Sequence, residues 1–250
     1  MTKYAMAVDL DRCQGCRACM EACKIENNTP QAVFWMYVFR TETGEYPDTK
    51  QSFLPRPCQH CNNPPCVKVC PVGARFRREE GIVLTDFERC IGCRYCEVAC
   101  PYGVNYFNWR QPMAALEAYE LDFTDPDTSA VTGGVIPSYK NPDLDQLQGE
   151  EQRLTAGSAH NVGVIEKCTF CVQRVDKGLQ PACVETCPVS ALQFGDIEDT
   201  DSPLSVYVRN RSTFKLLEEL GTDPSVIYLG GSPPPSDVRE IERPLTEVTS

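Results

Sequence analysis

Cysteine is the residue type in this chain whose number and spacing point to chemistry. Sixteen of the 250 residues are cysteine, so these side chains are expected to serve as ligands or bridges. Each of four groups opens with Cys-x2-Cys and closes with Cys-x3-Cys, and a proline follows the last cysteine of groups two to four. The chain therefore contains an internal repeat built on thiols. Its members are Cys13, Cys16, Cys19 and Cys23; Cys58, Cys61, Cys66 and Cys70; Cys90, Cys93, Cys96 and Cys100; and Cys168, Cys171, Cys183 and Cys187.

The third group, CIGCRYCEVACP, has the Cys-x2-Cys-x2-Cys-x3-Cys-Pro spacing of bacterial ferredoxins. Three thiolates of such a run hold one [4Fe-4S] cluster, and the fourth ligates the other cluster of a pair. The first group repeats this spacing without the proline, whereas groups two and four widen the middle gap to four and eleven residues. Because a longer flexible loop costs only about 0.6 kcal/mol per doubling of its length, all four groups are compatible with cluster binding.

Disulfides and zinc are the two competing uses of so many thiols. Disulfides within CxxC and CxxxC pairs would close very small loops and stabilise little. We also expect no secretory leader, since MTKYAMAVDL lacks a long apolar stretch. Four-thiolate zinc sites would use all sixteen cysteines, but their CxxC pairs are normally separated by about a dozen residues or more. The spacing favours iron–sulfur clusters, and a multi-zinc structural protein is the remote alternative.

Charge and hydropathy narrow the classes of partner. The formal net charge is −11 and the pI is near 4.8, which argues against nucleic acid because phosphate binding requires a basic face. The longest apolar run, AVFWMYVF at 32–39, is far shorter than the roughly 20 residues of a membrane-spanning helix. We therefore expect no nucleic-acid partner and no direct membrane span.

Short strand signals flank the cysteine groups. They are YAMAVDL at 4–10, GIVLTD at 81–86 and VSALQFGDI at 189–197. Each run is too brief for a helix of ordinary length, and each cysteine loop is expected to be followed by one or two helical turns. The pattern predicts an α+β fold of the ferredoxin type.

The segments between and after the motifs differ in character. Residues 33–39, VFWMYVF, predict a strand that is apolar on both faces. Residues 111–166 contain ten acidic residues and two basic ones, which indicates an acidic surface insertion. STFKLLEELGT predicts an amphipathic helix with Ser212 as its N-cap and Gly221 as its stop. Residues 231–250 open with GSPPPS and indicate an extended tail that binds a partner.

Four stretches of the chain carry a family resemblance. They resemble the four-cluster electron-transfer subunits of molybdopterin oxidoreductases of the DMSO reductase family. Among these, polysulfide reductase looks closest, with tetrathionate, arsenate and formate-converting relatives, and the ferredoxin-like subunit of alternative complex III is also similar. The match covers residues 3 to about 200. The stretches are YAMAVDLDRCQGCRACMEACKIEN, CQHCNNPPCVKVCPVGARF, DFERCIGCRYCEVACPYGVNYFNW and EKCTFCVQRVDKGLQPACVETCPVSALQFGD.

The resemblance implies two nested ferredoxin-like units with insertions and an extended C-terminal tail. The inner unit spans 58–110, and the outer unit is split between 1–57 and 167–200. Residues 111–166 are the acidic insertion, and 201–250 form a C-terminal helix and the tail. The same resemblance implies four [4Fe-4S] clusters, ligated by Cys13, Cys16, Cys19 and Cys187; by Cys23, Cys168, Cys171 and Cys183; by Cys58, Cys61, Cys66 and Cys100; and by Cys70, Cys90, Cys93 and Cys96.

The function implied by the resemblance is electron relay without substrate chemistry in this chain. The partners would be a molybdopterin catalytic subunit and an integral membrane quinone-binding subunit of a respiratory oxidoreductase acting on polysulfide, sulfur or arsenic oxyanions. The alternative is quinol oxidation in alternative complex III. The chain would be a peripheral subunit of a membrane complex, more often on the periplasmic side through export with a partner and in some relatives on the cytoplasmic side.

Several side chains beside the motifs have two interpretations. The basic residues next to the cysteines would compensate anionic clusters, although each would equally suit a solvated face. His60, inside CQHC, would tune a cluster or, as the preferred interpretation, pack or cap locally. Trp35 and Trp109 would dock a partner or, for Trp35 at least equally, belong to the core. The basic residues are Arg17, Lys24, Arg56, Arg75, Arg94, Lys167 and Arg174.

Overall fold

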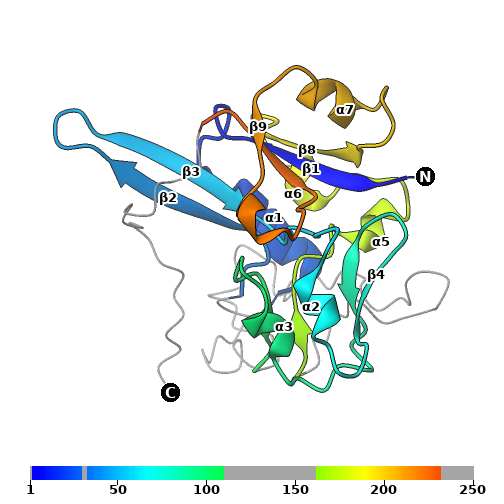
Figure 1. Ribbon diagram of the computed structural model, residues 1–250. Coiled ribbons are helices and arrows are strands. Elements are labelled where there is room, and N and C mark those ends of the chain that lie inside the picture. Colours follow the sequence, from blue (N-terminus) through cyan, green and yellow to red (C-terminus); the bar gives the residue numbers. More distant parts are fainter. Residues whose placement is uncertain (1, 30–32, 110–161, 232–250) are drawn as a thin grey trace, which may run out of the picture.

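The computed structural model describes residues 2–29, 33–109 and 162–231 of the chain. Its largest sheet has the strand order β8-β1-β10-β9, with β1 at Tyr4–Asp9, β8 at Leu192–Asp196, β10 at Val226–Leu229 and β9 at Thr213–Phe214. β1 pairs antiparallel with β8 and parallel with β10, so segments from the two ends of the described chain share one sheet (Figure 1). The predicted strands at 4–10 and 189–197 are β1 and β8.

Helices contain or follow the cysteine loops of this half of the molecule. α1 spans Ala18–Asn27 and contacts α6 at Ala182–Glu185, which also lies against β8. α5, at Val172–Val175, follows the CxxC of group four. α7, at Pro203–Val208, packs on β1 and β8, and it begins at Ser202, whose side chain accepts a hydrogen bond from the Ser205 backbone N–H.

A smaller half repeats this arrangement. α2 (Pro65–Lys68), β4 (Arg75–Arg77), β5 (Val83–Thr85) and α3 (Tyr95–Val98) correspond to α6, β8, β1 and α1 in the larger half. β5 is the strand predicted at 81–86, and β6 (Tyr106–Phe107) pairs with β7 (Ile165–Glu166). The main core joins both halves, because Met6 and Val8 share it with Ile82 and Leu84. Short helices, short strands and cysteine loops confirm the predicted ferredoxin-like α+β fold.

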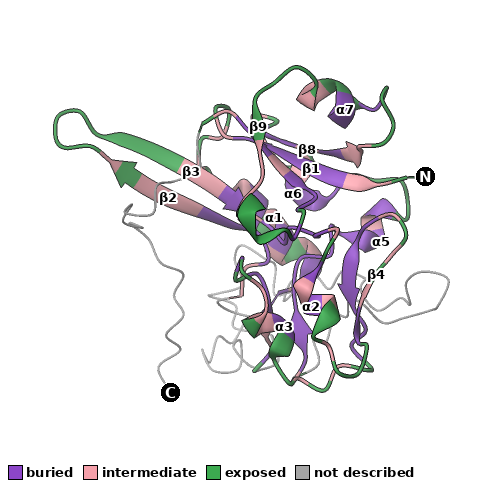
Figure 2. Ribbon diagram, in the orientation of Figure 1, coloured by how far each residue is buried: buried purple, intermediate pink, exposed green. Residues whose placement is uncertain are grey.

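A long hairpin projects from the body. β2 (Tyr37–Thr43) and β3 (Lys50–Arg56) pair antiparallel along their whole length (Figure 1). The strand predicted at 33–39 is therefore misplaced, since it begins at Tyr37 and runs on to Thr43. Trp35 and Met36 lie in the core just before it, so their apolar character reflects burial and not the strand itself. Figure 2 shows burial at the base of the hairpin and exposure toward its tip.

The helix predicted for STFKLLEELGT is wrong. Thr213–Phe214 form β9, and only Glu218–Leu220 form a single 3-10 turn, η2. Pairing with β10 overrides the helical pattern, because Phe214 lies opposite Tyr228 and their rings stack at 5.5 Å between centroids. Leu217, at φ 51°, also leaves the helical region, while Gly221 ends the turn at φ 64° as a stop signal should.

The predicted insertion at 111–166 falls largely outside the described residues, as does most of the tail. Its last two residues, Ile165 and Glu166, are buried in β7 and belong to the fold. No helix among the described residues is long and apolar enough to cross a membrane.

Candidate metal centres

The sixteen cysteines gather in four quartets that draw on distant parts of the chain. Three of the quartets each line a cavity. We name the quartets site 1 (Cys13, Cys16, Cys19 and Cys187), site 2 (Cys23, Cys168, Cys171 and Cys183), site 3 (Cys58, Cys61, Cys66 and Cys100) and site 4 (Cys70, Cys90, Cys93 and Cys96).

Site 2 is the most deeply buried quartet. All four of its thiols are buried. The pKa of Cys183 lies well above its ordinary value because of burial and because of the neighbouring thiols of Cys171, Cys23 and Cys168. These mutual effects place the four sulfur atoms in one region, between α1, α5 and α6.

The loops of sites 1 and 4 repeat each other residue by residue. Asp9 and Asp86 each accept backbone N–H groups two and three residues ahead, at 3.1 and 3.3 Å. Each also offers its backbone carbonyl to a cysteine N–H, Cys13 or Cys90, at 3.1 Å. The same type of Asx turn therefore orients each of the two cysteine loops.

Positive φ angles complete these two loops. Gly15 and Gly92 have φ values of 66° and 67°, which an L side chain adopts with strain. Arg17 and Arg94, one residue after the second cysteine, both have φ 63°. These turns let the chain wrap three thiols around one cavity before α1 or α3 begins.

Backbone N–H groups point at several sulfur atoms. The N–H groups of Arg75, Phe170 and Ala191 lie 3.5, 3.4 and 3.3 Å from the sulfurs of Cys70, Cys168 and Cys187. Such donors favour the charged thiolate and are one of the factors that tune iron–sulfur clusters.

The side chain of Asn27 serves two thiols of site 2. Its amide donates to Cys23 Sγ at 3.5 Å and to Cys171 Sγ at 3.8 Å. The sequence offered no motif for this residue, because its role depends on α5 folding back against α1.

Burial disfavours the thiolate form of these cysteines. It raises the pKa of Cys19, Cys61 and Cys168 to about 12 and that of Cys66 and Cys171 to about 11, with neighbouring thiols adding to the shift for all of these except Cys171. A metal must therefore displace protons as it binds, and its positive charge stabilises the thiolates. Within the described ranges, no three His, Cys, Asp or Glu side chains converge closely enough to hold a single ion. Quartets of thiols around a cavity fit a cluster of several irons.

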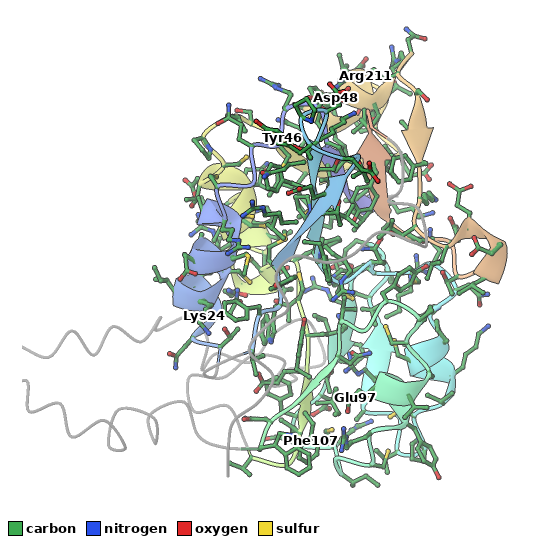
Figure 3. All side chains as sticks on the ribbon, turned by 90° about the vertical axis from the view of Figure 1, so that its left-hand side faces the viewer. Lys24, Tyr46, Asp48, Glu97, Phe107 and Arg211 are labelled. Atoms are coloured by element: carbon green, nitrogen blue, oxygen red, sulfur yellow. The ribbon has the colours of Figure 1, made fainter. Side chains whose placement is uncertain are left out.

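The two outer quartets open to the surface. Cys16 of site 1 and Cys93 of site 4 are exposed, whereas site 2 is buried throughout and three of the four cysteines of site 3 are buried. Figure 3 shows Glu97 and Phe107, which belong to the site 4 half, at the end of the molecule opposite Arg211, which pairs with Asp9 of the site 1 half.

His60 packs in the core, as its preferred interpretation predicts. Its Nδ1 accepts the N–H of Val83 at 3.0 Å, and its ring stacks on Phe170 at 3.7 Å. Burial, with Lys167 nearby, lowers the His60 pKa well below its ordinary value, so the ring is neutral. His60 and Phe170 hold the same place in the CxxC motifs of groups two and four, so the two motifs meet through this stack. His160 lies outside the described residues.

Four of the seven basic residues beside the motifs form two sets, one buried and one paired with carboxylates. Arg75 and Lys167 are buried, and Lys167 donates to the carbonyls of Val83 and Cys168. Arg94 and Arg174 form ion pairs with Glu97 and with Glu26 and Glu185.

The two tryptophans differ in exposure. Trp35 is 1% exposed and belongs to the core, whereas Trp109 is 66% exposed. The Trp109 ring lies edge-on to Phe107 at 4.4 Å, and the Arg94 guanidinium covers it at 5.2 Å.

Site 3 is contacted by a residue that lies far from its cysteines in the sequence. Tyr102, two residues after Cys100, shares a hydrogen bond of 2.5 Å with Thr222 and donates to the Leu216 carbonyl at 3.2 Å. Thr222 also hydrogen-bonds the Cys61 thiol and so lowers its pKa against the larger effect of burial. Thr222, just after η2, thus holds Tyr102, which lines this cavity. Because 120 residues separate the two, the sequence alone does not reveal this contact.

Comparison with known proteins agrees with this geometry. A family described as "4Fe-4S dicluster domain" matches residues 49–122 and 155–197, and one described as "4Fe-4S binding domain" matches residues 10–35. The chain is thus an iron–sulfur protein with ferredoxin-like cluster-binding domains.

Relatives of known assignment are similar over nearly the whole chain. A protein of Halobacterium salinarum, assigned as an iron–sulfur subunit of dimethyl sulfoxide reductase, is 40% identical over 94% of this chain and 82% of its own length. The arsenate respiratory reductase iron–sulfur subunit of Shewanella sp. is 37% identical over 91% and 96%. The iron–sulfur cluster-binding subunit of menaquinone reductase from Nitratidesulfovibrio vulgaris is 37% identical over 91% and 88%. The chain belongs to this family of iron–sulfur electron-transfer subunits of oxidoreductases.

Proposed function

We propose that this chain carries four [4Fe-4S] clusters and passes single electrons between two partner subunits. The observation that carries the proposal is the grouping of all sixteen cysteines into four quartets. Site 2 is buried, three of the four cysteines of site 3 are buried, and sites 1 and 4 each have one exposed cysteine. Such clusters, when bound, supply one-electron redox chemistry at potentials set by charge, burial and hydrogen bonds. The nested arrangement follows, with sites 3 and 4 in an inner unit and sites 1 and 2 in an outer one.

The protein itself binds, insulates and orients the redox centres. In each site, four thiolates would hold the metal, and N–H groups such as those of Phe170 and Ala191 would stabilise their charge. Buried apolar and aromatic side chains, among them Phe170 and Tyr102, exclude water from sites 2 and 3. We propose that the chain turns over no substrate by itself.

The two ends suit two different partners. Exposed apolar side chains gather at the site 4 end, where Val72 and Ile91 line the cavity and Tyr95, Val98 and Trp109 are exposed on the neighbouring segments. The described residues that line the site 1 cavity include no large exposed apolar side chain. We assign the site 4 end to an integral membrane quinone-binding subunit and the site 1 end to a molybdopterin catalytic subunit.

The names of the relatives support a respiratory reductase. They are subunits of dimethyl sulfoxide and arsenate reductases and of a menaquinone reductase. A sulfur or arsenic oxyanion is the proposed terminal substrate of the catalytic partner, with a peripheral position on the periplasmic face of the membrane. Quinol oxidation in a complex of the alternative complex III type is the second candidate, and the relative that serves a menaquinone reductase favours a quinone partner in both cases.

Metal analysis and reconstitution test this function. Anaerobically purified chain should be brown and contain about sixteen irons by the four-cluster count. Cys183→Ala should lose the site 2 cluster and fall to about twelve irons, whereas Thr186→Ala, an exposed neighbour, should keep all of them. Electron transfer should require an added catalytic partner. Zinc in place of iron, or turnover of an oxyanion by the isolated chain, would contradict the proposal.

A further inference from the structure

Arg75 holds a buried positive charge with no carboxylate partner among the described residues. Its side chain is 2% exposed, and its Nη2 donates to Asn105 Oδ1 at 2.7 Å. Its Nε and Nη1 atoms are buried and have no oxygen or nitrogen partner among the described residues, while its side chain also interacts with the Cys96 thiol. A buried guanidinium is costly without a counter-charge, so the cavity that Arg75 lines must supply one.

Two cysteine quartets meet at this side chain. Arg75 lines the site 4 cavity, and its backbone N–H points at Cys70 Sγ. Its hydrogen-bond partner Asn105 lines the site 3 cavity, so the guanidinium lies beside both sites. Asn105 fixes the guanidinium in turn, since its amide donates to the Cys96 carbonyl at 2.8 Å. The cation therefore lies between the quartets of sites 3 and 4.

The internal repeat provides a matched comparison. Ala74–Arg75 at the start of β4 corresponds to Ala191–Leu192 at the start of β8, because the carbonyls of Ala74 and Ala191 accept the N–H groups of Asp86 and Asp9 at the same distance, 2.8 Å. Leu192 lines the site 1 cavity as Arg75 lines that of site 4, and both are 2% exposed. The same backbone position thus carries a cation in one half and an apolar side chain in the other.

We propose that Arg75 is a potential-setting residue that raises the reduction potentials of the clusters in sites 3 and 4 above those they would have with a neutral side chain. The proposal rests on the function proposed above. Reduction of a cluster adds one electron and one negative charge without a proton. The fixed positive charge of Arg75 stabilises that added negative charge, because charges interact strongly in a water-poor cavity. Leu192 gives the site 1 cluster no such help.

Potentiometric titration of the full chain, followed by electron paramagnetic resonance, tests the proposal. Arg75→Gln removes the charge but keeps an amide for Asn105. We expect its equilibrium constant for reduction at sites 3 and 4 to fall about tenfold, which is 59 mV for one electron. Arg75→Lys should stay close to wild type, and Leu192→Met, the matched control, should move no potential.

The reciprocal variant gives an independent answer from the other half. Leu192→Lys should raise the potential of the site 1 cluster and leave site 4 unchanged. Unchanged potentials in iron-replete Arg75→Gln would overturn the proposal. So would loss of iron from Arg75→Gln together with an unmoved site 1 potential in iron-replete Leu192→Lys, because Arg75 would then be a structural residue. Absence of iron from the wild-type chain would instead refute the proposed function.

Discussion

The site 1 half and the site 4 half share one backbone plan and differ in what surrounds it. Asp9 and Asp86, and Gly15 and Gly92, hold equivalent turns with matching angles and distances. Around this common frame, the site 1 half is embedded in a four-stranded sheet, whereas the described part of the site 4 half contains the two-stranded pairs β4-β5 and β6-β7. The same cysteine loop therefore forms in two different structural surroundings. Those surroundings determine the exposure of each site, the charges near it and the partners that can reach it.

The largest expected effect is a difference between the sites in the rate at which they lose iron. Under anaerobic conditions a chelator should strip sites 1 and 4 first, because Cys16 and Cys93 are exposed and sites 2 and 3 are shielded. We expect about half of the iron to leave in a fast phase and the fold to be lost in the slow one, since cluster binding stabilises the folded state. Iron content and circular dichroism followed together would check this. A single phase for all the iron would mean that exposure does not distinguish the sites.

The equivalent glycines Gly15 and Gly92 should differ in how far substitution by alanine lowers the free energy of unfolding. A Cβ on Gly92 would lie 2.1 Å from the backbone oxygen of Gly163, whereas one on Gly15 would meet only the Phe53 ring, at 2.3 Å. Gly92→Ala should lower the free energy of unfolding by about 2 to 4 kcal/mol, and Gly15→Ala by less, since a ring can shift more easily than backbone.

Gly73→Ala is the control for the glycine pair. Its φ of 63° is also positive, but no atom lies within 4 Å of the added Cβ. We expect a loss of about 1 kcal/mol from backbone strain alone. Anaerobic denaturant titration measures all three, and equal losses at the three positions would show that strain alone decides the cost.

The exposed apolar surface of the site 4 half should matter for assembly and not for folding. Val98 is 85% exposed on α3, and Val206, on α7 in the other half, is 57% exposed. Val98→Asp should weaken binding to the membrane partner roughly tenfold, about 1.4 kcal/mol. Val206→Asp should leave that binding unchanged, and both should keep stability within about 0.5 kcal/mol. Binding measured with detergent-solubilised partner would decide, and equal weakening by both would place the interface elsewhere.

The smallest effect is expected at the ion pair beside site 4. Arg94 Nε and Glu97 Oε2 are 2.7 Å apart at the protein surface. Solvent screens such pairs, so Glu97→Gln should change the free energy of unfolding by less than about 0.5 kcal/mol. A thermal shift of several degrees at constant iron content would show that the pair supports the site 4 loop.

Local patterns predicted the repeating parts of the fold. The strands β1, β5 and β8 and the short helices follow from apolar runs and from the cysteine spacing, because these patterns are local properties of the sequence, although β1 and β8 pair with each other from distant parts of the chain. The C-terminal region shows the limit of this reasoning. No strand was predicted at 226–229, where β10 forms. The pairing of β10 with β9 overrides the helical pattern of 212–221, and this pairing depends on the sheet. The ligand sets stay a proposal drawn from the family resemblance and from the four quartets.

The sequence by itself determined that this is an iron–sulfur protein, because thiol spacing within a loop is a local property that the chain carries into any fold. Tertiary structure decided which thiols face one another, which two quartets reach the surface, and that Arg75 and Lys167 lie buried beside the quartets while Arg94 lies at the surface. Those outcomes depend on segments more than 100 residues apart packing together, as Asn27 and Cys171 do across 144 positions. The burial of a site and the charge around it depend on all of these neighbouring segments together, so they cannot be read from any single stretch of the sequence.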